Sequence, residues 1–309
     1  MAPAVIISLP NTSTTAINKK LNELREQVGA VTMGRVLTLI IAPGTDALLD
    51  ESITAANVAS QEHPSRVIVV LTGDRYAATA RLDAQLRLFG DAGAGEVMVL
   101  RLSGPLAEHA DSVVLPFLLP DIPVVAWWPD IAPPAPAKDR LGRLAIRRIT
   151  DATNGPDPLA AIRSRLTGYT AGDTDLAWSR ITYWRALLTA ALDQPPHEPV
   201  TSALVSGLAT EPALDTLAGW LAGRLDAPVR RATGELKVEL ARPSETVTLR
   251  RPQDGVIATL SRTGRPDALV PLPRRDTAEC LAEDLRRLDP DPVYEAALAG
   301  IQLVEYLAT

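Results

Sequence analysis

The sequence has few of the residues that carry redox or metal chemistry. Cys280 is the only cysteine among 309 residues, so no disulfide can form within the chain and a cysteine-rich zinc or iron–sulfur site is excluded. The three histidines, His63, His109 and His197, are scattered, and none has a histidine or cysteine neighbour at metal-ligand spacing. We therefore expect no metal site and no cofactor, and we interpret each histidine as structural or solvated.

Long apolar runs and basic blocks are also missing. Pro116, Pro120 and Pro123 interrupt the most apolar stretch before it could span a bilayer. The short apolar run near the N-terminus has no basic segment ahead of it, which argues against a secretory signal. The formal net charge of −6 provides no general attraction for nucleic acid. These absences predict a cytoplasmic protein with neither a membrane nor a nucleic acid as partner.

Aromatic residues make up only 4% of the chain, yet five of them are tryptophans. Trp127 and Trp128 directly follow the apolar run 122–126, which is typical of a buried parallel strand. Successive strand residues point to opposite faces, so we expect at least one indole to reach an edge, a cleft or a partner. Ligands of open α/β sheets bind just beyond the carboxyl ends of the strands, where this pair would lie. The alternative is that both rings cover core, with each indole N–H bonded to a nearby carbonyl.

The first half of the chain alternates strand and helix patterns. The strand patterns cover residues 35–42, 66–72, 97–102, 122–126 and 144–150, and the helix patterns cover 14–28, 46–62 and 105–115. Residues 81–88 alternate polar and apolar side chains, which indicates a half-solvated strand, with a helix as the alternative. This order predicts an α/β fold with a mostly parallel sheet flanked by helices and an antiparallel addition near residues 81–102.

The second half has a different pattern. Helices are expected over 157–166, 176–192, 213–225, 276–288 and 292–307, and strands over 200–206, 235–240, 245–250 and 255–261. The last three strands are separated by turn signals, which predicts an antiparallel meander. We therefore expect two domains, an N-terminal α/β domain over residues 1–154 and a C-terminal α/β or α+β domain over residues 155–309.

Motifs for catalysis or nucleotide binding are weak. The glycine-rich segment 90–95 precedes a strand, whereas a dinucleotide-binding loop follows one, and neither a P-loop nor a G-x-S-x-G elbow occurs. Arg147 and Arg148, with Arg163 and Arg165 nearby in sequence, are candidates for binding a phosphate or an acidic partner, or they are ordinary surface charge. We predict no catalytic residues and no cofactor-binding residues.

Several long segments carry a family resemblance. They include STTAINKKLNELREQ (13–27), GDAGAGEVMVLRL (90–102), HADSVVLPFLLPDIPVVAWWPD (109–130) and DLAWSRITYWRALLTAALD (175–193). These segments resemble the OpcA family of glucose-6-phosphate dehydrogenase assembly proteins in its actinobacterial form. The resemblance implies a non-enzymatic protein that binds glucose-6-phosphate dehydrogenase, favours its active oligomer and supports NADPH production by the oxidative pentose phosphate pathway. A dithiol switch within the chain is not expected, because Cys280 stands alone.

An activator of this kind needs a partner-binding surface and no catalytic constellation. We place the hypothetical partner-binding residues at Pro120, Asp121, Trp127, Trp128 and Pro129, because tryptophan is enriched among energetically important interface residues. One alternative is a sensor or enzyme that binds a sugar phosphate or nucleotide at the strand ends near Trp127 and Trp128. The other alternative is a self-associating structural protein whose tryptophans are buried against a second copy.

Overall fold

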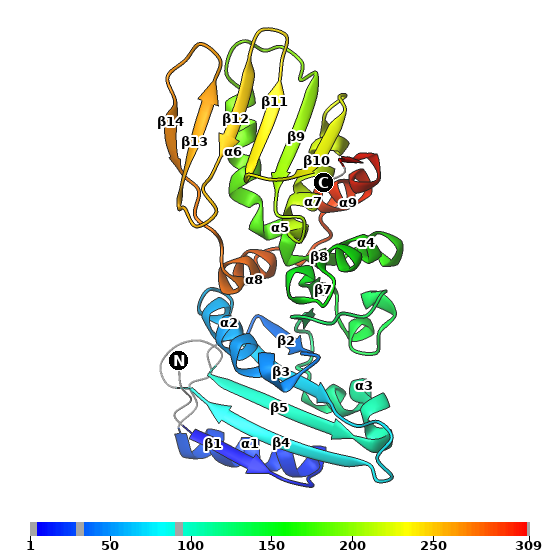
Figure 1. The fold of residues 1–309 in the computed structure, drawn as a ribbon. Coiled ribbons are helices and arrows are strands. Elements are labelled where there is room, and N and C mark those ends of the chain that lie inside the picture. Colours follow the sequence, from blue (N-terminus) through cyan, green and yellow to red (C-terminus); the bar gives the residue numbers. More distant parts are fainter. Residues whose placement is uncertain (1–4, 29–33, 90–94, 308–309) are drawn as a thin grey trace. The chain divides into compact units, whose positions relative to one another are not determined.

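The computed structural model describes residues 5–28, 34–89 and 95–307 (Figure 1). These residues form two compact units. The first unit contains the N-terminal residues up to Asp151 and two later segments, Tyr169–Asp173 and Thr277–Pro290. The second unit contains Ala152–Gly168, Thr174–Asp276 and the chain from Asp291 onwards. The predicted domain boundary at residue 154 stays a prediction, and two segments beyond it belong to the first unit.

The first unit is built on an eight-stranded sheet with the order β1-β4-β5-β3-β2-β6-β7-β8. The strands of this sheet are β1 (Val5–Leu9), β2 (Leu37–Ile41), β3 (Ser65–Thr72), β4 (Arg81–Leu88), β5 (Glu96–Ser103), β6 (Val124–Trp128), β7 (Arg147–Thr150) and β8 (Asp173–Asp175), of which β8 continues into the second unit after Asp173. The helices of the first unit are α1 (Thr14–Val28), α2 (Leu49–Glu62), α3 (Ala110–Val114) and α8 (Thr277–Leu285). Strands β5, β3, β2, β6 and β7 are parallel, whereas β4 runs antiparallel to β5 and β1. This confirms the predicted parallel sheet with an antiparallel addition.

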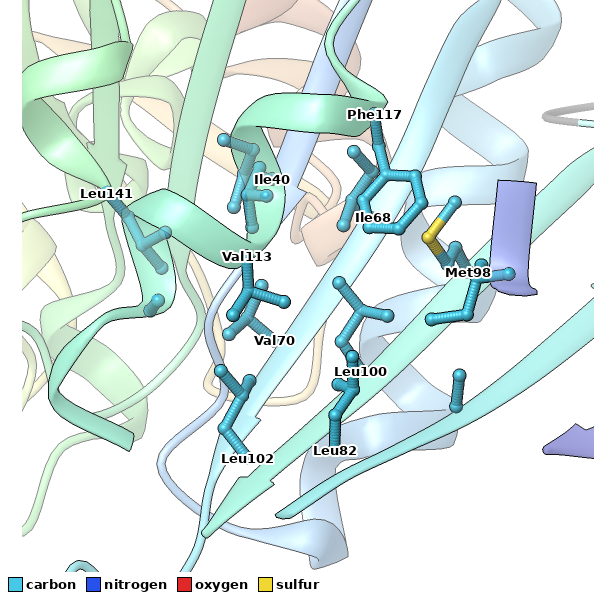
Figure 2. Close-up of a cluster of buried hydrophobic side chains, with 14 of the residues drawn as sticks. Ile40, Ile68, Val70, Leu82, Met98, Leu100, Leu102, Val113, Phe117 and Leu141 are labelled. Atoms are coloured by element: carbon cyan, nitrogen blue, oxygen red, sulfur yellow. The ribbon is translucent and has the colours of Figure 1, made fainter. Parts of the chain in front are cut away.

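One face of this sheet carries a large apolar core (Figure 2). Alternate residues of neighbouring strands point into it, including Ile40, Ile68 and Leu100. Helix α1 contributes its apolar stripe of Ile17, Leu21 and Leu24, and Phe117 closes another side, together with α3. Helix α2 packs against β3 and against α8.

The second unit contains a seven-stranded sheet with the order β14-β13-β12-β11-β9-β10-β15. Its strands are β9 (Ser202–Gly207), β10 (Val229–Thr233), β11 (Lys237–Ala241), β12 (Thr246–Arg250), β13 (Ile257–Arg262), β14 (Ala268–Pro271) and β15 (Glu305–Tyr306). Its helices are α4 (Pro158–Gly168), α5 (Leu176–Arg180), α6 (Thr182–Leu192), α7 (Pro212–Arg224) and α9 (Pro292–Gly300). Strands β11 to β13 form the predicted antiparallel meander and β14 extends it, whereas β9, β10 and β15 are parallel.

Helices α7 and α9 approach each other closely because glycines face one another. A Cβ atom added at Gly219 would lie 2.3 Å from the carbonyl oxygen of Ala297, and one added at Gly300 would lie 2.1 Å from the carbonyl oxygen of Gly219. Only glycine leaves enough room for this contact of backbone with backbone.

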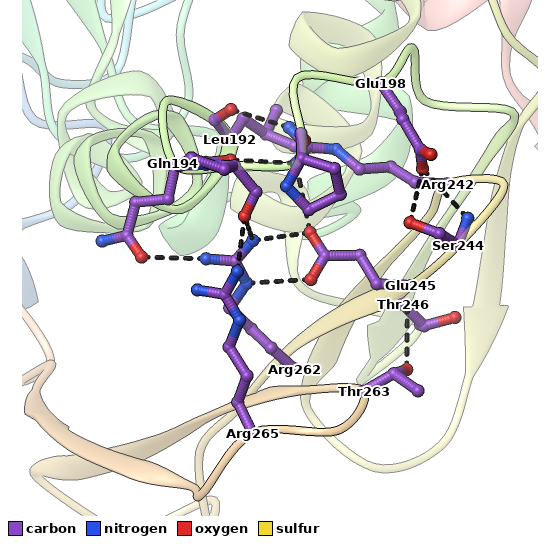
Figure 3. A network of polar contacts seen from close by, with 12 residues as sticks. Leu192, Gln194, Glu198, Arg242, Ser244, Glu245, Thr246, Arg262, Thr263 and Arg265 are labelled. Atoms are coloured by element: carbon purple, nitrogen blue, oxygen red, sulfur yellow. Dashed lines mark hydrogen bonds and ion pairs between the residues drawn. The ribbon is translucent and has the colours of Figure 1, made fainter.

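The buried carboxylate of Glu245 lies at the centre of a polar network in the second unit (Figure 3). The side chain of Glu245 accepts hydrogen bonds from Arg262 at 2.6 Å and from Arg242 at 3.2 Å. These two arginines also donate to carbonyl groups between Leu192 and Pro196, so one network connects the end of α6 with the meander.

The structure differs from the predicted elements in several places. The helix expected over 105–115 is broken into two 3₁₀ turns flanking α3, because His109 leaves the helical region and Pro116 lies within the second turn, Leu115–Phe117. The helix expected over 176–192 divides into α5 and α6 at Ile181. Strands β1, β8, β10, β14 and β15 were not predicted, and the helix expected over 292–307 ends at Gly300, before β15. Residues 90–94 of the glycine-rich segment lie outside the described residues.

Among the described residues, no helix is both long enough and apolar enough to cross a membrane.

Candidate functional site

The two adjacent tryptophans end β6 and lie on opposite faces of the sheet. Trp127 is 1% exposed and Trp128 is 4% exposed. Trp128 belongs to the apolar core of the first unit, which also contains Leu141 and Ala145. The expectation that at least one indole reaches an exposed edge or cleft is therefore wrong, since both rings cover core. The alternative, that both rings cover core, is correct about their burial. Its second part, a hydrogen bond from each indole N–H, is not met, because the indole nitrogen of Trp127 has no hydrogen-bond partner among the described residues.

The five hypothetical partner-binding residues do not form one patch. Pro120 and Asp121 are exposed in the turn before β6, whereas Trp127, Trp128 and Pro129 are buried at its far end. Asp121 has a φ of 59°, in the left-handed region that aspartate tolerates better than most residues. Within this set, only Pro120 and Asp121 are exposed.

An acidic group occupies the carboxyl end of β6. Asp130 is buried and accepts a hydrogen bond at 2.8 Å from the backbone N–H of Gly44, which follows β2. A Cβ atom at Gly44 would lie 3.0 Å from the carboxylate of Asp130. A carboxylate at this position disfavours the binding of a phosphate group at these strand ends.

The arginines singled out from the sequence are part of the fold. Arg147 is buried and donates to Asp284 at 2.6 Å, and Arg148 is buried and donates to Asp173. The guanidinium of Arg163 lies 4.8 Å from the ring centre of Tyr306, and Arg165 is buried beside Ser164. Arg147 and Arg148 belong to the first unit, and Arg163 and Arg165 belong to the second.

The remaining candidates for chemistry are dispersed. Cys280 lies buried on α8. Within the described ranges, no three side chains among histidine, cysteine, aspartate and glutamate are grouped so that they could hold a metal ion.

The second unit contains a pocket, which we call the arginine pocket, with a volume of about 110 Å³. Its lining residues are Thr153, Arg180, Ile181, Trp184, Leu208, Glu211, Ala213, Leu214, Gly234, Leu236, Arg251, Gln253, Arg274 and Arg275. Leu208 and Glu211 lie between the carboxyl end of β9 and the first turn of α7, and Gly234 and Leu236 follow β10. The pocket thus lies at the carboxyl ends of two parallel strands, where α/β sheets bind ligands.

A buried arginine holds the loop at this edge of the sheet. Arg231 of β10 donates to the carbonyl oxygens of Gly207 and Leu208, and its Nε lies 3.7 Å from the carboxylate of Asp215 on α7. Burial raises the pKa of Asp215, opposed by hydrogen bonding to Tyr306 and by the charge of Arg231. Burial first, and then the charge of Asp215, raises the pKa of Tyr306 to about 12.

The sequence analysis missed the arginine pocket. Its four arginines come from α5, from the residue after β12 and from the segment between β14 and α8. The doublets Arg250–Arg251 and Arg274–Arg275 were visible, but nothing in their spacing shows that the fold brings them together.

Comparison with known proteins gives two consecutive family matches. The family described as the N-terminal domain of a glucose-6-phosphate dehydrogenase subunit matches residues 56–167, and the family described as the C-terminal domain of such a subunit matches residues 171–298. No curated protein matches the chain.

Among solved structures, aldose-aldose oxidoreductase from Caulobacter crescentus is similar with a TM-score of 0.43 and 13% identity, over 87% of this chain and 96% of that one. Glucose-6-phosphate 1-dehydrogenase from Mycobacterium avium is similar with a TM-score of 0.41 and 12% identity, over 88% of this chain and 94% of that one. Both similarities are too distant to assign a function. The two family matches, which together cover most of residues 56–298, show that this chain belongs to the OpcA family of glucose-6-phosphate dehydrogenase assembly proteins.

Proposed function

We propose that this chain is a non-catalytic assembly factor and allosteric activator that binds glucose-6-phosphate dehydrogenase in the cytoplasm. In this role it favours the active oligomer of the enzyme and so supports NADPH production in the oxidative pentose phosphate pathway. The observation that carries the proposal is the pair of consecutive family matches, both named for a glucose-6-phosphate dehydrogenase subunit.

The physical mechanism of such an activator is preferential binding. A protein that binds one conformational or quaternary state of an enzyme more tightly than another shifts the enzyme toward that state. A difference of about 1.4 kcal/mol in binding free energy shifts the equilibrium tenfold. The activator therefore needs a complementary surface on the favoured oligomer and no reacting groups of its own.

We place part of that surface at the turn containing Pro120 and Asp121. Both residues are exposed, and the proline restricts the conformations of the free turn. Trp127, Trp128 and Pro129 then act from within the core, by holding β6 and the turn in place. Restricting a contact loop before binding lowers the entropy cost of the complex.

The alternative of a sugar-phosphate or nucleotide site near Trp127 and Trp128 has less support. Both indoles are buried, and the carboxylate of Asp130 occupies the end of the strand. The arginine pocket has chemistry suited to an anion, but it is built from other residues.

Size-exclusion chromatography with light scattering tests the proposal. The chain mixed with its cognate dehydrogenase is expected to elute as a complex with the summed mass of both proteins, and the isolated chain should be run at several concentrations to measure self-association. Asp121→Lys is expected to weaken the complex. Asp226→Lys, the same charge change at an exposed turn of the second unit, is the control. Separate elution of the two wild-type proteins would contradict the proposal.

A further inference from the structure

Arginines outnumber acidic residues in the lining of the arginine pocket. Its lining contains four arginines and one acidic residue, Glu211. Glu211 makes only a loose pair, with its Oε2 3.9 Å from Nη1 of Arg274, and the Arg274 side chain is 58% exposed. An exposed pair at this distance contributes little.

Arg251 is the best-defined cation of the pocket. It is 5% exposed, and its Nη1 donates to the carbonyl oxygen of Leu272 at 2.9 Å. Its Nε is buried and has no hydrogen-bond partner within the described part of the chain. Among the described residues, no carboxylate lies within 4.0 Å of the Arg251 guanidinium either. Burial, and then the charge of Arg274, lowers the pKa of Arg251. A buried cation with an unused donor is costly unless an anion compensates it.

The backbone around the pocket also favours an anion. The first turn of α7, with Ala213 and Leu214, lines the pocket and directs the positive end of the helix dipole toward it. Trp184 is buried in the lining, and the guanidinium of Arg251 lies 5.6 Å from its ring centre. Arg251 is thus held from two sides, by the ring and by the carbonyl of Leu272.

We infer that the arginine pocket binds a phosphate group, either as inorganic phosphate or as the phosphate end of a small phosphorylated metabolite. Guanidinium groups match phosphate oxygens in geometry as well as charge. A volume of about 110 Å³ is enough for several water molecules or one such group, with the rest of a larger ligand extending to solvent. The inference does not rest on the proposed role with the dehydrogenase, because the isolated chain suffices to test it.

Isothermal titration calorimetry on the full chain at low ionic strength provides the test, with inorganic phosphate, glucose 6-phosphate and glucose as separate probes. We expect saturable binding of one phosphate-bearing ligand per chain and no binding of glucose. Tighter binding of the sugar phosphate would identify an ester as the ligand, and equal binding would identify phosphate itself. The absence of saturable binding by both phosphate compounds would overturn the inference.

Two substitutions locate the binding in the pocket. Arg274→Gln removes an exposed lining cation and is expected to weaken binding about tenfold or more, as the loss of a hydrogen bond to a charged group does. Arg250→Gln is the matched control. It removes the same charge from the exposed last residue of β12, where Arg250 pairs loosely with Glu235 at 3.5 Å, and it is expected to leave the affinity unchanged.

Arg251→Gln is the second test of location, and circular dichroism reports whether that variant folds. A folded Arg251→Gln variant is expected to lose phosphate binding. If this variant does not fold, the result with Arg274→Gln decides whether the ligand binds in the pocket. Equal weakening by Arg274→Gln and Arg250→Gln, or wild-type affinity in Arg274→Gln, would overturn the inference.

Discussion

Arg147 and Asp284 form a buried ion pair in the first unit, with 2.6 Å between Nη2 of the arginine and Oδ1 of the aspartate. The pair joins β7 to α8, which are separated by 137 positions in the sequence. Arg147 also donates to the carbonyl oxygen of Asp289 at 2.9 Å. These contacts attach the segment Thr277–Pro290 to the first unit, although it is flanked on both sides by the second.

Removing one partner of this pair is expected to be costly. Asp284→Ala leaves Arg147 buried without its carboxylate and should lower the free energy of unfolding by about 3–5 kcal/mol. Urea unfolding measured by circular dichroism provides the value.

The matched control for Asp284→Ala is Arg286→Ala on the same segment. Arg286 pairs with Glu62 at 2.9 Å, but both side chains are more than half exposed. Its loss should cost about 1 kcal/mol or less. Equal losses in the two variants would show that the buried pair does not anchor α8.

The network around Glu245 makes the stability of the second unit depend on pH (Figure 3). The hydrogen bond from Arg262 is the main cause that lowers the pKa of Glu245 below its ordinary value of 4.5. Because this pKa is lower in the folded than in the unfolded chain, the stabilisation is present above the unfolded value and is lost as the pH falls through the folded value.

We therefore expect wild-type protein to lose more stability than Glu245→Gln when the pH falls from about 5 to about 3. The amide cannot ionise, so its variant should be less stable near neutral pH and less sensitive to acid. Urea midpoints at several pH values measure this difference. Parallel curves for the two proteins would show that Glu245 does not contribute.

The close contact between α7 and α9 predicts a difference between two glycines of one helix. Gly219→Ala places a methyl group 2.3 Å from the carbonyl oxygen of Ala297 and should destabilise the chain by about 1–3 kcal/mol through overpacking. At Gly223 the nearest atom lies 3.1 Å away, and alanine is the better helix former, so Gly223→Ala should cost less. Thermal unfolding compares them, and an equal or greater loss with Gly223→Ala would contradict the packing argument.

The burial of Trp128 predicts a structural effect rather than direct partner contact. Trp128→Ala should lower the free energy of unfolding by about 3–5 kcal/mol, as for other large aromatic residues in cores. Trp128→Phe retains much of the apolar volume, and its folded fraction should bind the dehydrogenase as the wild type does. A stable, folded Trp128→Phe variant with a large loss of affinity would place this indole in the interface.

Local sequence patterns were sufficient to predict the parallel sheet and the meander. Apolar runs such as residues 66–72 and the alternation in residues 81–88 depend only on which faces of a strand are buried. Strand β1 was missed because Val5 and Ile6 are exposed on an edge, so its pattern of burial is irregular. Strand β14 was missed because its four residues include a proline and are mostly exposed.

The sites were harder to predict, because each depends on contacts between distant residues. Arg147 was interpreted as a possible ligand for phosphate, but its partner Asp284 is 137 positions away. Trp127 and Trp128 were placed correctly at a strand end. Their burial could not be predicted from neighbouring residues in the sequence. The sequence analysis missed that Arg251 and Arg274 line one pocket for the same reason, because the two residues lie in different segments of the chain.

The most direct test of the central claim is the initial rate of the cognate glucose-6-phosphate dehydrogenase across substrate concentrations, with and without this protein. The proposed role predicts a higher rate or a lower apparent KM, saturating as the protein is added, together with a stable complex of the two proteins. An unchanged rate at every substrate concentration, with no complex formed, would contradict it.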